Sequence, residues 1–252
     1  MKRHNSIAVL SDIHGNSLAL EAVLNDVAHR KCATLFNLGD IFYGPLDPAG
    51  TWDMLNRLHI PTILGNQDRV LLEGGPEWEA NPTFTRTRDA IGPDGLNWLA
   101  SLPPSLTGTP DTRDILLCHG TPGNDTRYLL EAVTTGVPVQ RPCEAILEDV
   151  LPQAAGCSLV LAGHSHHPGQ VVCDGITVVN PGSVGLPAYD DDTPPHSMAA
   201  GSPHAQYAVL TPSASGWECD FISVEYDWKA AAVLARQNDR EDWAQWLSTG
   251  MA

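Results

Sequence analysis

Short apolar runs alternate with segments of helical periodicity over the first 66 residues. Residues 7–10, 34–38 and 61–64 are apolar runs of the length typical of buried strands. Between them, apolar residues recur at helical spacing in residues 16–27 and 52–58. Strands that alternate with helices in this rhythm predict an α/β unit with a parallel sheet.

The rest of the chain is predicted to contain more strands than helices. We expect strands at residues 115–117, 159–162, 170–173, 176–179, 206–210 and 217–224. We expect helices at residues 96–99, 127–133 and 144–151, and a C-terminal helix at about 228–247. Residues 187–204 are rich in Pro, Asp, Ser and Gly, which predicts a mobile loop. No linker separates independent cores, so residues 1–252 are predicted to form a single domain.

Charge and composition restrict the partners. The 252 residues carry a formal net charge of −16, and an acidic surface repels a polyanion, so no nucleic-acid polymer is expected as a partner. No apolar run approaches the length needed to span a bilayer, and residues 1–5 lead into a strand without the apolar core of a signal peptide. We therefore expect no membrane partner and predict a cytoplasmic protein.

The cysteines support the same location. They form no CxxC pair, and several lie in apolar segments, where a free thiol packs as a small hydrophobe. The six residues are Cys32, Cys118, Cys143, Cys157, Cys173 and Cys219. We expect reduced structural thiols rather than a disulfide or zinc framework.

Side chains that are able to bind metal follow the apolar runs. Five expected strands each end at such a residue or pair, namely Asp12 with His14, Asp40, Asn66, His119, and His164 with His166. Taken singly, each has an ordinary structural explanation, such as a helix cap, a turn or a surface histidine. Together they favour one site, because the carboxyl ends of strands in one sheet meet at the same edge.

This set of donors is too large for one ion. It comprises two aspartates, one asparagine and four histidines, whereas a four-coordinate zinc takes at most four protein ligands. Two ions that share a bridging carboxylate fit the number better. Mixed imidazole and carboxylate donors suit transition metals, so we expect Mn2+ first, with Fe, Zn, Co or Ni as alternatives. Two ions about 3.5–4 Å apart are able to bind two phosphate oxygens and to activate a water.

The same residues form motifs that resemble those of the calcineurin-like metallophosphoesterases. The motifs are Asp12-Ile13-His14-Gly15-Asn16, Gly39-Asp40, Gly65-Asn66-Gln67-Asp68, Cys118-His119-Gly120 and Gly163-His164-Ser165-His166. Residues 180–185, Asn-Pro-Gly-Ser-Val-Gly, are similar to the small prokaryotic phosphodiesterase branch of that family. The resemblance extends from residue 6 to about residue 225. It implies an α/β fold built as a four-layer α/β/β/α sandwich, in which two mixed sheets are flanked by helices and the site lies at the strand ends.

The resemblance also implies how the ligands divide. The first metal would be bound by Asp12, His14 and His166, the second by Asn66, His119 and His164, and Asp40 would bridge them. The substrate would be a small phosphate ester, either a diester or a monoester, hydrolysed by in-line attack of a hydroxide held between the metals. The catalytic candidates are Asp40, Asn66, Gln67 and Asp68.

One position departs from the family pattern. The family usually carries a histidine, thought to assist as an acid, where this chain has Gln67. An amide has no proton to give near neutral pH, and general acid help is typically worth about 10²–10⁴-fold. We therefore expect a bias toward good leaving groups, such as aryl esters, phosphoanhydrides or nucleotide-like substrates, unless another residue or a water supplies the proton. Asp68 would normally orient that histidine, and it is equally suited to cap the following helix.

Two further residues are candidates for binding substrate. Asn16 would contact the phosphate or cap a helix, and Arg127 would meet a phosphate or stay solvated. Alternative functions are a catalytically silent scaffold that binds a protein partner, a dinucleoside polyphosphate hydrolase, a nuclease or a protein phosphatase. The intact ligand set argues against the scaffold and the acidic charge against the nuclease. The sequence predicts no oligomeric state.

Overall fold

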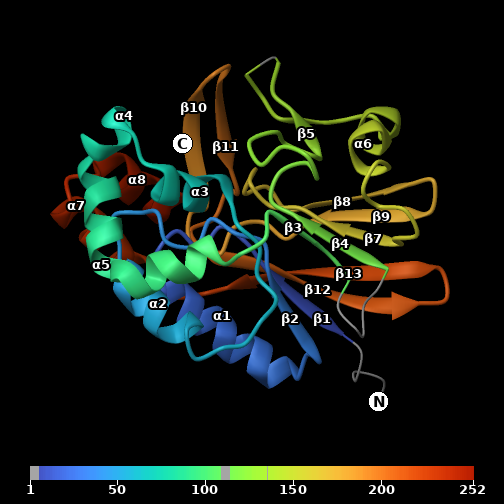
Figure 1. The fold of residues 1–252 in the computed structure, drawn as a ribbon, viewed down its shortest axis with the longest axis horizontal. Coiled ribbons are helices and arrows are strands. Elements are labelled where there is room, and N and C mark those ends of the chain that lie inside the picture. Colours follow the sequence, from blue (N-terminus) through green and yellow to red (C-terminus); the bar gives the residue numbers. More distant parts are fainter. Residues whose placement is uncertain (1–5, 109–113, 135) are drawn as a thin grey trace.

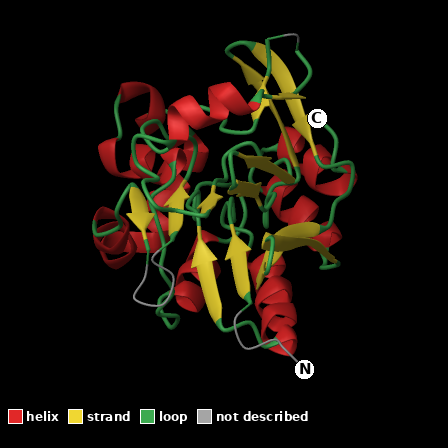
Figure 2. Ribbon diagram, turned by 90° about the vertical axis from the view of Figure 1, so that its right-hand side faces the viewer, coloured by secondary structure: helices red, strands yellow, loops and turns green. Residues whose placement is uncertain are grey.

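The computed structural model describes residues 6–108, 114–134 and 136–252. Its two main sheets pack face to face, and helices cover their outer faces (Figure 1). A view turned by 90° shows strands in the middle of the molecule with helices on either side (Figure 2). Three apolar clusters separate these layers, which confirms the four-layer α/β/β/α arrangement that the motif resemblance implied.

The first sheet contains four strands in the order β13-β12-β1-β2. Their bounds are β1 (Ile7–Leu10), β2 (Thr34–Asn37), β12 (Ala205–Ser213) and β13 (Gly216–Val224). Strands β1 and β2 are parallel, whereas β12 is antiparallel to both of its neighbours. Side chains of β1 alternate between two apolar clusters, because successive residues of a strand point to opposite faces. Ala8 and Leu10 pack with the helices, and Ile7 and Val9 pack against the second sheet.

The second sheet contains five strands in the order β3-β4-β7-β9-β8. Their bounds are β3 (Ser105–Thr107), β4 (Ile115–Cys118), β7 (Leu159–Leu161), β8 (Gly169–Cys173) and β9 (Ile176–Asn180). Strands β4, β7 and β9 are parallel and the two edge strands are antiparallel to them. Ile115 and Leu117 of β4 face the first sheet, and Leu116 and Cys118 face the outer helix of this half. Both faces of this sheet are therefore covered.

The helices differ in number between the two outer faces. On the side of the first sheet lie α1 (Ser17–Arg30), α2 (Pro48–Leu55), α3 (Asn66–Glu73), α4 (Pro76–Glu79), α5 (Pro82–Ala100), α7 (Trp228–Gln237) and α8 (Glu241–Thr249). On the side of the second sheet lies α6 (Cys143–Val150). Helix α1 begins after Asn16, whose side chain accepts a hydrogen bond from the backbone N–H of Ala19. Its buried residues, among them Leu20 and Val23, pack on β1.

Two predicted elements of the first half differ from the structure. Residues 61–64 form no strand, since only Thr62 pairs, in an isolated bridge with Asn37. The predicted helix at 96–99 is the end of α5, which starts at Pro82 after the capping residue Asn81. The strand predicted at residues 61–64 is therefore wrong, whereas the helix predicted at 96–99 is confirmed as part of a longer one.

Three segments of the second half also differ. Residues 127–133, predicted as a helix, contain instead the short strand β5 (Glu131–Ala132), which pairs with β6 (Val139–Gln140). The predicted loop at 187–204 contains a hairpin of β10 (Ala188–Asp192) and β11 (Pro195–Ala199). The predicted C-terminal helix breaks into α7 and α8, because Asp239 adopts a φ of 60° between them.

The prediction of reduced thiols is wrong for one pair of cysteines. Cys143, at the start of α6, and Cys173, at the end of β8, form a disulfide with 5.3 Å between their Cα atoms. Packing of α6 on the second sheet joins residues that are 30 apart in sequence, and no local motif links them. The other cysteines are free, as predicted: Cys32, Cys118, Cys157 and Cys219. Among the described residues, no helix is long and apolar enough to span a bilayer, and the cytoplasmic location stays a prediction.

Candidate metal centre

Six of the seven predicted ligands lie in loops that follow strands of both sheets. Asp12 with His14 follows β1, and Asp40 follows β2, in the first sheet. In the second sheet, His119 follows β4, and His164 with His166 follows β7. Asn66 is the first residue of α3. The expectation that all these strands belong to one sheet is wrong; the site lies where the ends of two sheets meet.

Six of the seven side chains form two compact groups. Within each group the potential ligand atoms all lie within 4.8 Å of one another, and the groups are Asp12, His14, His166 and Asp40, His119, His164. The seventh residue joins the second group, since Asn66 Oδ1 lies 2.9 Å from His119 Nε2. The folding of the chain therefore brings together the residues that the sequence placed in one site.

Strained backbone conformations concentrate in these loops. Eight non-glycine residues of the described ranges have a positive φ, and five of them are ligand candidates: Asp12, His14, Asp40, His164 and His166. Such conformations are uncommon for residues with a Cβ and persist only where surrounding contacts enforce them. Their accumulation at one place indicates that the loops are shaped to direct these side chains.

Hydrogen bonds orient three of the imidazole rings. In each, Nδ1 lies close to a backbone carbonyl oxygen and donates its proton there, which directs Nε2 toward the other predicted ligands. The distances are 2.9 Å from His14 to Tyr43, 2.8 Å from His119 to Leu38 and 2.7 Å from His166 to Leu186. A second partner that fixes the tautomer in this way is typical of histidines that ligate metals.

In the first group, the Nε2 atoms of the two histidines lie close to atoms that accept hydrogen bonds, not to atoms that donate them. His14 Nε2 lies 3.1 Å from His166 Nε2, and His166 Nε2 lies 3.3 Å from Asp12 Oδ1. Asp12 Oδ1 is buried and has no hydrogen-bond partner among the described residues. Lone pairs that face one another in a buried site repel unless a cation lies between them. These residues therefore fit a pair of divalent ions.

Burial and mutual charge determine protonation in the cluster. Burial lowers the pKa of His14 and His164 to about 4, so both rings are neutral at pH 7. Burial also opposes protonation of His119, but the Asp40 and Asp12 carboxylates outweigh it and raise its pKa to about 10. Burial would likewise raise the pKa of Asp40, yet the neighbouring His119 holds it below its usual range. The carboxylates stay ionised, and their field favours bound cations.

A cavity of about 250 Å³ opens directly above these residues. Asp40, Asn66, His164 and His166 form its floor, and Gln67 lies beside them. Its walls include six residues that the sequence analysis did not single out: Tyr43, Trp78, Tyr189, Arg240, Trp243 and Trp246. They come from five separate helices, strands and loops, so no spacing in the sequence connects them.

The two predicted substrate ligands do not line this cavity. The Asn16 side chain caps α1 and donates to the Gly185 carbonyl and the Tyr226 hydroxyl. Arg127 pairs with Asp149 at 3.1 Å and borders a different cavity. For both residues, a structural role explains the observed contacts and substrate binding does not.

Asp68 holds two of the ligand loops together through hydrogen bonds to their backbone. Its two carboxylate oxygens accept hydrogen bonds from the backbone N–H groups of Gly65 and Ile41, at 3.1 and 2.9 Å. Burial, with the nearby Asp40 carboxylate, raises the pKa of Asp68 to about 7. The residue caps α3 and ties the Asn66 loop to the Asp40 loop.

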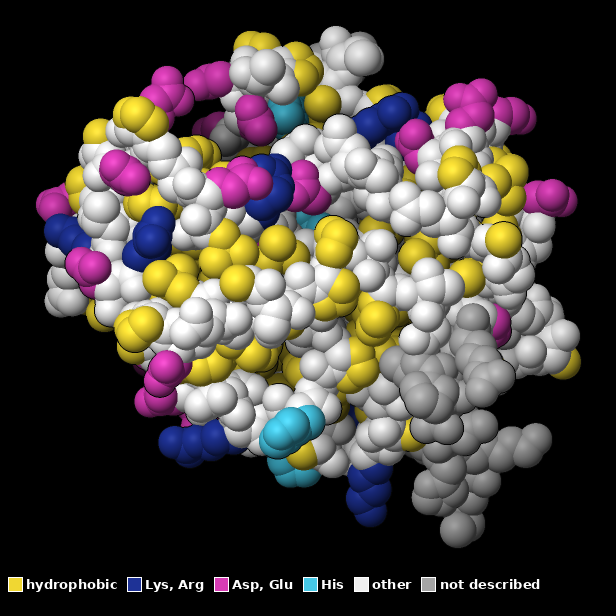
Figure 3. Space-filling view, viewed as in Figure 1, with side chains coloured by type: hydrophobic (Ala, Val, Ile, Leu, Met, Phe, Trp, Pro, Cys, Tyr) yellow, Lys and Arg dark blue, Asp and Glu magenta, His cyan; other side chains and the backbone are white. Residues whose placement is uncertain are grey.

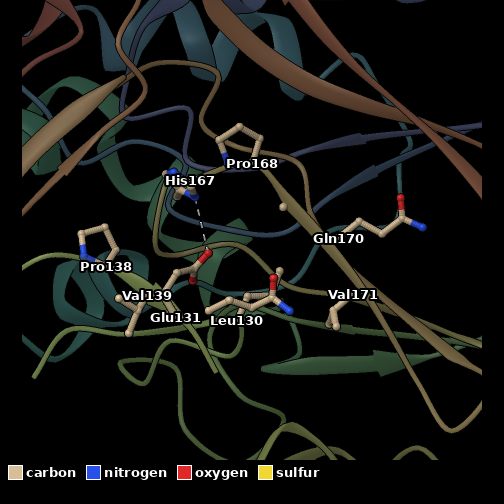
Figure 4. A pocket seen from close by; sticks show the side chains of 10 residues that line it. Leu130, Glu131, Pro138, Val139, His167, Pro168, Gln170 and Val171 are labelled. Carbon is tan, nitrogen blue, oxygen red and sulfur yellow. Dashed lines mark ion pairs between the residues drawn. The ribbon is translucent and has the colours of Figure 1, made fainter. Parts of the chain in front are cut away.

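Glu131 lines a second cavity, of about 230 Å³, between the β5–β6 hairpin and β8 (Figure 4). Its Oε1 lies 3.8 Å from His167 Nδ1, and its Oε2 is buried without a hydrogen-bond partner in the described part of the chain. Burial raises the pKa of Glu131 to about 7, although Ser165 and Arg141 act in the opposite direction. A buried carboxyl that titrates near neutrality makes stability depend on pH.

We expect the free energy of unfolding to fall as the pH rises from about 4.5 to 7. The Glu131 carboxyl has a reference pKa of 4.5 and a pKa of about 7 in the folded state, so the folded state binds its proton more tightly. The contribution is complete below pH 4.5, is lost across this window and amounts to about 3 kcal/mol. Asp68, whose pKa in the folded state is also about 7, loses stability over the same window. Urea denaturation of Glu131→Gln between pH 4 and 8 should therefore show a fall smaller than that of wild type by about 3 kcal/mol, and Glu144→Gln, exposed on α6, should show the wild-type fall. Identical pH dependence in wild type and Glu131→Gln would contradict the assignment.

Comparison with known proteins identifies relatives over nearly the whole chain. Uncharacterized protein MJ0912 of Methanocaldococcus jannaschii is 25% identical over 261 aligned positions, which cover 94% of each chain. The crystal structure of a metallophosphoesterase from Sphaerobacter thermophilus is 25% identical, with a TM-score of 0.75, and the match covers 98% of this chain and 99% of that one. Hypothetical protein PH1004 from Pyrococcus horikoshii OT3 shares the fold at 21% identity, with a TM-score of 0.76 and coverage of 97% and 98%.

A family model identifies the domain itself. The model of the calcineurin-like phosphoesterase superfamily domain matches residues 6–203, a segment that contains all seven ligand candidates. With the four-layer fold and the two groups of buried donors at the strand ends, this match shows that the chain belongs to the calcineurin-like phosphoesterase superfamily.

Proposed function

We propose that the protein is a phosphoesterase that requires two divalent metal ions and hydrolyses small phosphate esters. The observation that carries the proposal is the pair of buried donor groups whose Nε2 and carboxylate atoms face one another. Membership of the superfamily supports the same reaction class. The cavity above the donors gives an ester access to them.

The proposed ligand assignment follows the two groups. Asp12, His14 and His166 would hold one ion, and Asn66, His119 and His164 would hold the other. Asp40 is the proposed bridge, because its carboxylate acts on both groups: its Oδ2 lies 3.4 Å from His119 Nε2, and its charge also opposes the burial that lowers the pKa of His14. When bound, the two ions would lower the pKa of a water and neutralise charge on the phosphate oxygens.

The side chains around the cavity favour direct attack by water. Within the described ranges, no Ser, Thr or Cys lines the cavity, so no serine, threonine or cysteine nucleophile with an adjacent base is at hand. The proposed reaction is in-line hydrolysis without a covalent phosphoenzyme. Gln67 lines the cavity beside Asn66 and serves only as a hydrogen-bonding group.

Cavity size and charge favour a small ester over a dinucleoside polyphosphate. A volume of about 250 Å³ is small beside the roughly 300–1,000 Å³ of sites for drug-sized ligands. Asp190 and Asp191 lie on its wall and repel a chain of phosphates. On the face of the molecule that Figure 3 views, acidic side chains are spread out and the coloured side chains form no large basic patch. A nucleic-acid polymer is likewise a poor fit.

Metal analysis combined with an ester panel tests the proposal. Protein purified in chelator should bind close to two Mn2+ ions, as measured by calorimetry, and should then hydrolyse 4-nitrophenyl phosphate or bis(4-nitrophenyl) phosphate. Single-turnover hydrolysis in heavy-oxygen water should place the label in the phosphate product. Absence of turnover in the Mn2+-loaded protein would favour the silent scaffold, and a trapped phosphoenzyme would contradict direct attack.

A further inference from the structure

Part of the cavity wall comes from α8 and the residue that precedes it. Trp243 and Trp246 of α8 line it, and Arg240, the residue that precedes α8, lines it with them. These residues lie outside the matched segment 6–203. The break between α7 and α8 places them, because Asn238 Nδ2 donates to the Pro45 carbonyl and Asp239 adopts a positive φ. The break in the helix therefore also shapes the cavity.

Arg240 is held rigidly at this wall. Its Nε and Nη2 donate to the Asp242 carboxylate at 2.9 and 2.6 Å, and its Nη1 donates to Thr83 Oγ1 at 3.2 Å. The guanidinium lies 5.2 Å from the centre of the Trp243 ring. Among the described residues it is the only Lys or Arg that lines the cavity. The Tyr43 hydroxyl is a further hydrogen-bond partner of Arg240. Because a guanidinium carries five N–H groups, Asp242, Thr83 and Tyr43 leave at least one of them for a ligand.

Aromatic rings line the same cavity in two sets. The inner rings pack on the ligand histidines, with 5.7 Å between the centres of Trp243 and His14 and 4.7 Å between Tyr189 and His166. The outer rings, Trp78 and Trp246, are partly exposed toward the cavity. The outer pair therefore retains ring surface for a ligand.

We propose that Arg240, Trp78 and Trp246 form a specificity site for phosphodiesters that carry a flat aromatic group. Arg240 would donate to a phosphate oxygen, and the two tryptophans would pack against the aromatic ring. A diester carries one negative charge, which suits a single guanidinium beside the Asp190 and Asp191 carboxylates better than a polyphosphate does. The inference rests on the proposed function, because it places the ester over the metal centre.

Two substrates with the same leaving group isolate the aromatic contact. Phenyl 4-nitrophenyl phosphate and methyl 4-nitrophenyl phosphate both release 4-nitrophenolate and differ only in the group that stays on phosphorus. We expect wild type to prefer the phenyl ester about tenfold in kcat/KM, within the range that stacking on aromatic side chains provides. Trp246→Ala should bring this ratio close to one, and Trp228→Ala, on α7 outside the cavity, should leave it unchanged.

Arg240 is tested with the same pair of esters. Arg240→Gln should lower kcat/KM for both esters by about 10–100-fold, because that is the usual effect of losing a hydrogen bond to a charged group. The phenyl-to-methyl ratio should stay the same. Arg240→Lys should recover part of the loss, because it restores the charge without the planar fork. Arg236→Gln, exposed at the end of α7 and paired with Glu241, is the matched control. Thermal midpoints of all variants show whether a loss of folding contributes.

The outcomes separate this inference from the proposed function. If the Mn2+-loaded wild type hydrolyses the esters but Trp246→Ala keeps the full phenyl preference, or Arg240→Gln keeps full kcat/KM, the specificity site is refuted and the function stands. If wild type hydrolyses neither ester, the proposed function fails. Calorimetry then compares the binding of diphenyl phosphate with that of dimethyl phosphate. The specificity site requires tighter binding of diphenyl phosphate to wild type, and Trp246→Ala must remove this preference.

Discussion

Asp40→Asn should weaken the binding of divalent metal by about 10²–10³-fold and abolish phosphoesterase turnover at micromolar Mn2+. Asp40 is 1% exposed, lies 3.4 Å from His119 and occupies the proposed bridging position. Removing one partner of a buried charge pair typically costs about 3–5 kcal/mol, which corresponds to this loss of affinity. Asparagine keeps the shape of the side chain, so the loss reports on charge rather than on packing.

Calorimetric titration of Mn2+ into chelator-treated protein measures the change. The matched control is Asp53→Asn, which removes a carboxylate from the exposed face of α2 and should leave metal affinity unaltered. Without metal, Asp40→Asn should unfold at a lower temperature than wild type, because His119 makes the folded state favour the ionised Asp40 carboxylate. Wild-type affinity for two ions in Asp40→Asn would rule out the bridging role.

The ligands could be predicted from the sequence because each follows an apolar run. A buried strand is recognisable locally, and a polar residue at its end must lie at a sheet edge. Asp12 and His119 were found in this way, and the structure brings them to 3.9 Å. That β1 and β4 belong to different sheets could not be predicted, because strand order is set by long-range packing rather than by local pattern.

The walls of the cavity could not be predicted for a related reason. Trp78, Tyr189 and Arg240 are isolated in sequence, and each has an ordinary role as a core or surface residue. Tyr189 lies in a hairpin whose polar composition is typical of a loop, and backbone pairing between β10 and β11 makes it a strand. Arg240 reaches the cavity through a helix break that depends on a contact between α7 and Pro45.

Gln67→His should raise the hydrolysis of esters with poor leaving groups while changing aryl esters little. Gln67 lines the cavity next to Asn66, and its backbone N–H donates to Asp40, so a side chain at this position points at the proposed site of reaction. The Gln67 Oε1 atom is buried and accepts no hydrogen bond from the described residues. An imidazolium in its place is able to protonate a departing alkoxide, whereas an aryl oxide leaves without help.

The gain should lie near or below the lower end of the about 10²–10⁴-fold range of general acid catalysis. An imidazole at position 67 needs a partner to orient it, and both carboxylate oxygens of Asp68 already accept backbone N–H groups. We therefore expect the alkyl-to-aryl ratio of kcat/KM to increase about 10–100-fold. The increase should fade as the pH rises through about 6.5, because only the protonated ring acts as an acid.

The measurement compares dimethyl phosphate with methyl 4-nitrophenyl phosphate over pH 5.5–8.5 in wild type, Gln67→His and the control Gln140→His. Gln140 lies on the exposed strand β6, so a histidine there adds the same titrating group away from the cavity. An alkyl-to-aryl ratio that is the same in Gln67→His and wild type at every pH would mean that the amide does not limit leaving-group protonation. Another group, or a water, would then supply the proton. A rise in the ratio that persists above pH 8 would instead attribute the gain to hydrogen bonding, since a neutral imidazole donates without releasing a proton.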